Sequence, residues 1–338
     1  MAKADTHIDV SKLAEIALAG TYSGLDARLR QIDFAWNTDG VKAEGTFCYL
    51  AFRDGRLTQD EFLEFVYHKI VPFCLNRDYI RSCRERLDDT HDERWFYEPV
   101  DAAKELFIKA KNKNPKSGEP GEVVLFALLE GLLRAPRIVA KMRLKTNPNM
   151  EVYGSDAIHM KYHPEDESLT VFWGEAKLYT QLSSALDEIA SSIKGFREYD
   201  SNRKGVQRDF DIDVIQAHPD LDTPDVESTR DALLTYFDPY TEHSNHVREI
   251  HACLAMWDWS FCKQVSGLDP AEAEDVFKQK YQERIESACS LFIEKLKSNS
   301  LEQFRFHFFL IPLHDIADFR RRFCNKLGLP FNENSAGD

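Results

Sequence analysis

The chain has 338 residues, of which 43% are hydrophobic and 12% aromatic, so it can bury one large core or two smaller ones. Its formal net charge of −14 argues against a general nucleic-acid binder, and no segment approaches the roughly 18 unbroken apolar residues of a membrane helix. Seven cysteines are dispersed without a C-x-x-C pair, and the first residues lack an apolar signal core. We therefore expect a cytoplasmic protein with reduced thiols.

Apolar spacing predicts an N-terminal α/β region over residues 1–111. The expected elements are a helix at 9–20, a strand at 45–52 and helices at 57–75 and 101–112.

A loop rich in Pro, Gly and Lys, NKNPKSGEPG (112–121), opens a central region that we place at 112–220. The helix expected at 122–133 is apolar nearly all round, so it should be buried. The remaining elements expected here are alternating strands at 152–162 and 169–179, joined by HPEDES, then a helix at 181–199 and a strand at 209–217.

The C-terminal region, 221–338, is expected to pack with the N-terminal region. Its expected elements are strands at 249–259 and 303–313, a long helix at 271–297 and a last helix at 314–327. The mixed order of the whole chain predicts an α/β fold, with a mixed central sheet flanked by helices on both faces.

Charge is distributed unevenly along the chain. The stretch from Lys109 to Lys145 is basic, whereas residues 211–242 carry nine acids and one base. If the basic stretch contacts nucleic-acid phosphates, the lysines we expect to do so are Lys113, Lys116, Lys141 and Lys145. A solvated surface explains the same pattern. The acidic stretch, or the apolar strand at 249–259, is a candidate contact for a partner protein.

A turn centred on HPEDES sets the register of the central hairpin: residues whose numbers sum to 331 then face each other. One face of the hairpin would carry six apolar residues, namely Ile158, Met160, Tyr162, Leu169, Val171 and Trp173. Asp156, Glu175 and Lys177 would lie at one end of that same face. A slip of one residue would break this arrangement.

Charged groups on a core-facing surface are costly unless they are paired or bind an ion. A divalent metal between Asp156 and Glu175 relieves their repulsion, and Mg²⁺ prefers such oxygen ligands. Mn²⁺ is the alternative ion. Lys177 would then orient the attacking water or stabilise charge on the phosphate. The structural alternative is a salt bridge of Lys177 at the end of a sheet.

Two other patterns carry less information. His243, His246, His251 and Cys253 are residue types that bind zinc, but their spacing fits no standard site. The sequence has no G-x-x-x-x-G-K-[ST] loop, so an ATP-driven motor of that kind would have to be supplied by another protein.

The segments GSD (154–156) and GEAK (174–177) resemble the PD-(D/E)xK nuclease superfamily, with Ser155 in place of the usual proline. The resemblance implies a restriction-endonuclease-like core, with additional α/β elements at both ends of the chain. In many members the helix before the hairpin supplies another metal-binding carboxylate. Glu122 is our candidate and Glu130 the alternative, although Glu122 also suits the first turn of a helix as an acid stabilised by the dipole. Gln181 is a weak match to a polar residue that the superfamily places near the scissile phosphate.

A wider resemblance covers most of the chain. GEVVLFALLEGLLRAPRIVAKM, GSDAIHMKY and WGEAKLY are similar to the HamA family, the nuclease subunits of the bacterial Hachiman anti-phage defence system. This resemblance implies a cytoplasmic bacterial DNA nuclease whose activity a helicase subunit, HamB, holds in check. Two alternatives stay open: a non-catalytic interaction subunit on a nuclease-derived fold, and a nuclease that acts on RNA.

Overall fold

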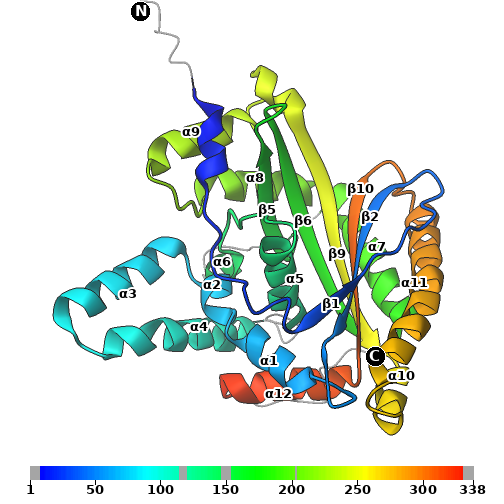
Figure 1. Ribbon diagram of the computed structural model, residues 1–338. Coiled ribbons are helices and arrows are strands. Elements are labelled where there is room, and N and C mark those ends of the chain that lie inside the picture. Colours follow the sequence, from blue (N-terminus) through cyan, green and yellow to red (C-terminus); the bar gives the residue numbers. More distant parts are fainter. Residues whose placement is uncertain (1–7, 114–119, 146–153, 202–203, 330–338) are drawn as a thin grey trace, which may run out of the picture.

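Six strands form one mixed sheet in the computed structural model, which describes residues 8–113, 120–145, 154–201 and 204–329 (Figure 1). In sheet order the strands are β1 (Leu29–Ile32), β2 (Lys42–Leu50), β10 (Arg305–Leu313), β9 (Val247–Asp258), β6 (Ser168–Tyr179) and β5 (Ala157–His163). The four inner strands run parallel, and the edge strands β1 and β5 are antiparallel to their neighbours. Strands from all three expected regions therefore share this sheet.

Helices cover both faces of the sheet, as the sequence predicted (Figure 1). One face packs against α1 (Gln59–Tyr67), α2 (Ile70–Cys74), α4 (Arg94–Lys113), α5 (Pro120–Gly131) and α12 (Ile316–Leu327). The other face packs against α7 (Leu182–Arg197) and α11 (Ala273–Ser298). This confirms the mixed α/β class.

Smaller elements complete the described chain. The helices are η1 (Val10–Glu15), α3 (Arg77–Thr90), α6 (Lys141–Lys145), α8 (Gln207–Ala217), α9 (Val226–Thr235), η2 (Glu242–His246), α10 (Phe261–Gln264) and η3 (Val265–Gly267). The strands are β3 (Phe52–Arg53) with β4 (Arg56–Leu57), and β7 (Tyr199–Asp200) with β8 (Gly205–Val206). No helix among the described residues is long and apolar enough to cross a membrane.

The β5–β6 hairpin has the predicted register. Ile158 pairs with Trp173, and Tyr162 pairs with Leu169, so the partners' numbers sum to 331. The six apolar residues expected on one face all lie in one buried cluster, against η1, α8 and α9. Burial of this face fixes the register, because a shift of one residue would turn all six side chains toward the opposite face of the sheet.

Helix α5 is buried along its length, as its apolar sequence predicted. Gly121 allows its first turn to lie directly on β6, since a Cβ there would come within 2.2 Å of the Leu178 side chain. This close approach brings the N-terminal end of α5, with Glu122, to the strand that carries Glu175 and Lys177.

Three sequence predictions were wrong in detail. The helix expected at 57–75 is broken into α1 and α2. Residues 209–217 form helix α8 and not a strand: its buried positions, Gln207, Asp211 and Ile215, recur every four residues. Only Val10–Glu15 of the helix expected at 9–20 is helical, as a 3₁₀ turn. Most of the expected 112–121 loop lies outside the described residues, and Pro120 and Gly121 already belong to α5.

Candidate active site

Asp156 immediately precedes β5 and is fastened to β6 by two hydrogen bonds. Its backbone amide donates to the carbonyl of Gly174 over 2.7 Å. Its Oδ2 accepts a hydrogen bond of 3.0 Å from the amide of Ala176. The carboxylate therefore lies opposite the E-A-K segment through main-chain pairing, as the expected register requires.

Glu175 and Lys177 project from the same face of β6, and Oε1 of Glu175 lies 2.7 Å from Nζ of Lys177. Burial and the charge of Asp156 raise the pKa of Glu175 to about 7, although Lys177 and Ser192 oppose this shift. Burial alone would lower the pKa of Lys177, but Glu175 and Asp156 outweigh it and raise that pKa. The three groups thus form one coupled electrostatic unit.

A cavity of about 430 Å³ opens beside this unit. Asp156, Glu175 and Lys177 line it, together with Ser192 on α7, Asp200 on β7, Gln207 on α8 and His251 on β9. A salt bridge that only closed the end of a sheet would not need a cavity of this size beside it. The cavity is large enough to admit a phosphate group with its surrounding water, which favours a binding role for the three residues.

The sequence did not single out the contributions of Ser192, Asp200 and Gln207 to this cavity. They come from α7, β7 and α8, which follow the hairpin in the chain, with no local motif around any of them. Only the packing of α7 and α8 against the sheet brings them to the cavity.

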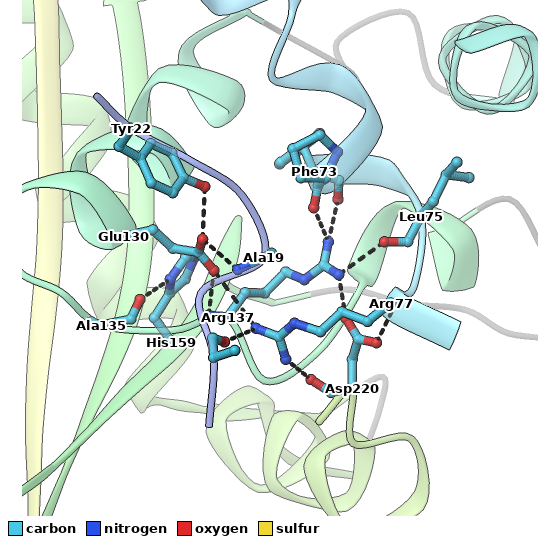
Figure 2. Close-up of polar contacts among 12 residues, drawn as sticks. Ala19, Tyr22, Phe73, Leu75, Arg77, Glu130, Ala135, Arg137, His159 and Asp220 are labelled. Atoms are coloured by element: carbon cyan, nitrogen blue, oxygen red, sulfur yellow. Dashed lines mark hydrogen bonds and ion pairs between the residues drawn. The ribbon is translucent and has the colours of Figure 1, made fainter. Parts of the chain in front are cut away.

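The two candidate helix carboxylates differ sharply in their surroundings. Glu122, 5% exposed, lines a small pocket that Asp156 also lines. Glu130 is fully buried farther along α5 and belongs to a polar network (Figure 2). It accepts hydrogen bonds from the Tyr22 hydroxyl at 2.7 Å and from the amides of Ala19 and Arg137, both at 2.8 Å. Of the two, only Glu122 shares a pocket with Asp156, but that pocket contains neither Glu175 nor Lys177, and Glu122 does not line the larger cavity.

The network around Glu130 is structural in character. Figure 2 shows Arg77 and Arg137 between Glu130 and Asp220, with Arg137 also donating to the carbonyls of Phe73 and Leu75. It ties α5 to the segment before β1, to α2 and to the chain after α8.

The remaining predicted site residues do not gather at the cavity. Gln181 is the exposed N-cap residue of α7 and is not part of the cavity lining. Lys141 is 4% exposed, and its Nζ lies 2.9 Å from Oδ1 of Asp211 and 2.6 Å from the carbonyl oxygen of Ser155. A buried ion pair cannot serve as a surface contact to phosphate, so that expectation for Lys141 was wrong. The side chains of Lys113, Lys116 and Lys145 lie outside the described residues.

The donor chemistry of the cavity suits a hard divalent cation. Mg²⁺ commonly takes one or two protein carboxylates and completes its shell with water and substrate oxygens. Asp156 and Glu175 supply carboxylates, and burial together with the charge of Asp156 raises the pKa of Glu175, a shift that a bound cation would oppose. Within the described part of the chain, three or more His, Cys, Asp or Glu side chains do not converge at metal-binding distance. Among these residues, therefore, neither the zinc alternative nor a closed set of Asp156, Glu175 and Glu122 is formed, and a hard cation would rely on two carboxylates completed by water and substrate oxygens.

Comparison with protein families gives one result that covers the site. The model of the HamA family matches residues 30–327, a span that contains nearly the whole sheet, both helical layers and every residue of the cavity. A comparison with curated proteins found no significant match. The family match extends over most of the chain, so the protein belongs to the HamA family, which implies a role in Hachiman anti-phage defence.

Proposed function

We propose that this protein is a Mg²⁺-dependent nuclease that hydrolyses phosphodiester bonds of DNA in anti-phage defence, under the control of the helicase subunit HamB. The observation that carries the proposal is the meeting of Asp156, Glu175 and Lys177 in one cavity, with the pKa of Glu175 raised to about 7. Such a perturbed carboxylate beside a cation in a cavity is typical of a catalytic site.

Each residue has a definite task in this proposal. Asp156 and Glu175 hold the metal, with Glu122 assisting from the first turn of α5. A bound Mg²⁺ supplies Lewis-acid stabilisation of the negative charge on the phosphate. Lys177 donates hydrogen bonds that orient the attacking water or stabilise the charge that builds up on the phosphate oxygens. The superfamily resemblance implies products with 5′-phosphate and 3′-hydroxyl ends.

The charge of the protein supports delivery of DNA by a partner. The net charge is −14, and the acidic lining residues Asp156, Glu175 and Asp200 face a single lysine, Lys177. Such a field repels a polyanion at long range. A helicase that holds the DNA would overcome this repulsion and would also keep the nuclease away from the cell's own DNA.

The fold favours one of the two surfaces that we considered for contact with that partner. Strand β9 lies between β10 and β6, and Trp257 on it is 2% exposed, so the strand at 249–259 is a poor candidate for the contact. The acidic stretch 211–242 keeps many exposed residues on α8, on α9 and in the turns beside them. It remains our candidate contact.

Nicking of supercoiled plasmid tests the proposal. The purified protein, alone and with its helicase, is incubated with plasmid in Mg²⁺ or in EDTA. We expect nicking that requires Mg²⁺ and that the helicase modulates. Absence of cleavage in every mixture would favour the non-catalytic alternative, and faster cleavage of an RNA of matched sequence would favour the ribonuclease alternative.

A further inference from the structure

His251 stands in the wall of the candidate active site but has no role in the chemistry proposed above. It lies on β9 directly opposite Trp173 of β6, and the next residue on the same face, Cys253, lies opposite Glu175. His251 is 2% exposed and lines the cavity.

A neighbouring arginine fixes the tautomer of His251. Nε of Arg197, on α7, lies 2.9 Å from Nε2 of the imidazole. A guanidinium can only donate, so Nε2 must accept and the ring proton must be on Nδ1. The ring therefore has a single N–H donor, at Nδ1.

The Nδ1 atom is left as the free donor of the ring. It has no hydrogen-bond partner among the described residues and, unlike the unpaired Nε2 of His159, it is not fully buried. An atom of His251 that is neither sealed nor paired must open onto the space that the residue lines.

A network behind the ring holds it in this orientation. Arg197 pairs with Glu249 at 2.7 Å, and Glu249 also accepts from Nε1 of Trp173 at 3.1 Å and from Nε of Arg208 at 2.8 Å. The ring stacks on Phe306, with their centroids 5.8 Å apart. The imidazole is thus fixed by packing and by hydrogen bonds, as a preorganised donor requires.

The ring also stays neutral. Burial and the positive charge of Arg197 lower the pKa of His251 to about 3. Because the ring is uncharged, it forms no ion pair with the carboxylates of the cavity. Its N–H group therefore stays available to an anion that enters. The Arg197 charge behind Nε2 polarises the ring and strengthens Nδ1–H as a donor.

We propose that His251 is a phosphate-binding residue, which donates Nδ1–H to an oxygen of a DNA phosphate adjacent to the scissile one. The proposal rests on the nuclease function proposed above. His251 is two residues along and one strand across from Glu175, which corresponds to ~8 Å between backbone positions. That separation is comparable to the spacing of successive phosphates along a DNA strand, so a phosphate next to the one held at Glu175 can meet His251.

Neutralising single phosphates tests the contact directly. Oligonucleotides that carry one methylphosphonate at successive positions are bound to the wild-type protein and to His251→Phe, in Ca²⁺ and with the helicase present if binding requires it. We expect the wild type to lose about tenfold in affinity at one position, because a hydrogen bond to a charged group is lost there. His251→Phe should bind unmodified DNA about tenfold more weakly and lose nothing further at that position.

Matched variants separate this role from a structural one. His251→Asn keeps an N–H near the place of Nδ1 and should retain part of the position-specific effect. His307→Asn changes another buried histidine, on β10, which contacts Thr46 and not the cavity; it should leave the wild-type pattern unchanged. Equal loss at every position for the wild type and His251→Phe, or no DNA binding by the wild type, would overturn the proposal.

A measurement on the wild-type protein covers the case in which the His251 variants fail to fold. Nitrogen NMR of the histidine rings reports which nitrogen is protonated. The proposal requires the Nδ1–H form and a shift of its Nδ1 resonance when DNA is added; an Nε2–H form or an unchanged resonance contradicts it. These experiments measure binding and not cleavage. DNA that binds as expected but is never cleaved would therefore contradict the nuclease proposal without contradicting the phosphate contact.

Discussion

The amide of Ala176 donates a 3.0 Å hydrogen bond to Oδ2 of Asp156, so the middle residue of the E-A-K segment holds the acid of the opposite strand. The amide of Asp156 in turn donates to the carbonyl of Gly174. Main-chain pairing therefore sets the distance between Asp156 and Glu175. Any change that shifts the β5–β6 register would separate the carboxylates even if every site residue were kept.

Glu122 and Glu130 should respond in opposite ways to substitution by glutamine. Glu122→Gln is expected to lower the rate of DNA cleavage at least tenfold, with a small change in unfolding free energy, because it weakens a metal ligand. Glu130→Gln removes the buried negative charge near Arg77 and Arg137, so it should lower the unfolding free energy by about 3 kcal/mol. Cleavage rates and urea unfolding of both variants check this, and the reverse pattern would make Glu130 the functional carboxylate.

Lys141 should behave as a structural lysine. Lys141→Met leaves Asp211 buried without its cation and should destabilise the protein by about 3 kcal/mol, with no change in the salt dependence of DNA binding. The prediction for Lys113, Lys116 and Lys145 is different. Their combined replacement by alanine should reduce the slope of log affinity against log salt by roughly one unit for each lysine that contacts phosphate. A slope that falls with Lys141→Met and not with the triple variant would reverse these assignments.

Glu249 should give the protein a characteristic acid sensitivity. Burial opposes its ionisation, but Arg208 and Arg197 outweigh that effect and lower the pKa of Glu249 to about 2, from an ordinary 4.5. A depressed pKa adds stability that is complete above about pH 4.5 and is lost as the pH falls toward 2. Glu249→Gln should therefore be less stable than the wild type by about 3 kcal/mol at pH 7, and the difference should shrink below pH 4.

Urea unfolding of both proteins at pH 7 and pH 3 measures this difference, and the other carboxylates cancel in the comparison. The exposed Glu302 provides a control through Glu302→Gln, which should show no such dependence. A difference for Glu249→Gln that stays constant with pH would mean that its ion pairs do not stabilise the fold.

The helicase should form a stable complex with this chain. Co-expression followed by size-exclusion chromatography should give one peak that contains both proteins at micromolar concentration. Reversing the charge of exposed acids in the 211–242 stretch, for example with Asp231→Lys and Glu242→Lys, should weaken the complex if that stretch is the contact. Separate elution with and without DNA would rule out a stable complex.

The sequence predicted the site hairpin well because two independent constraints agreed there. The polar turn HPEDES fixes where the chain reverses, and the apolar face from Ile158 to Trp173 allows one register only. The buried helix α5 was equally clear, since an all-round apolar helix has one physical explanation.

Helix α8 shows where local pattern fails. The letters DFDIDV alternate with period two, which is typical of a strand, but Asp211 is buried against Lys141 and Ile215 lies one turn farther along. A buried ion pair between residues 70 positions apart has no local signature. Tertiary contacts therefore decide the structure there, and for the same reason sequence analysis missed the ion pair of Lys141 and the cavity positions of Ser192 and Gln207.

Cleavage by variants of Glu175 and Lys177 tests the central claim most directly. Glu175→Gln and Lys177→Met preserve side-chain volume, and Lys194→Met changes an exposed lysine on α7 as a control. The rate of DNA cleavage in Mg²⁺ should fall at least a hundredfold for the first two variants and stay at the wild-type level for the third, with all three folded. EDTA should abolish cleavage by the wild type. A wild-type rate from Glu175→Gln or Lys177→Met, or cleavage that persists in EDTA, would contradict the assignment of this cavity as a metal-dependent nuclease site.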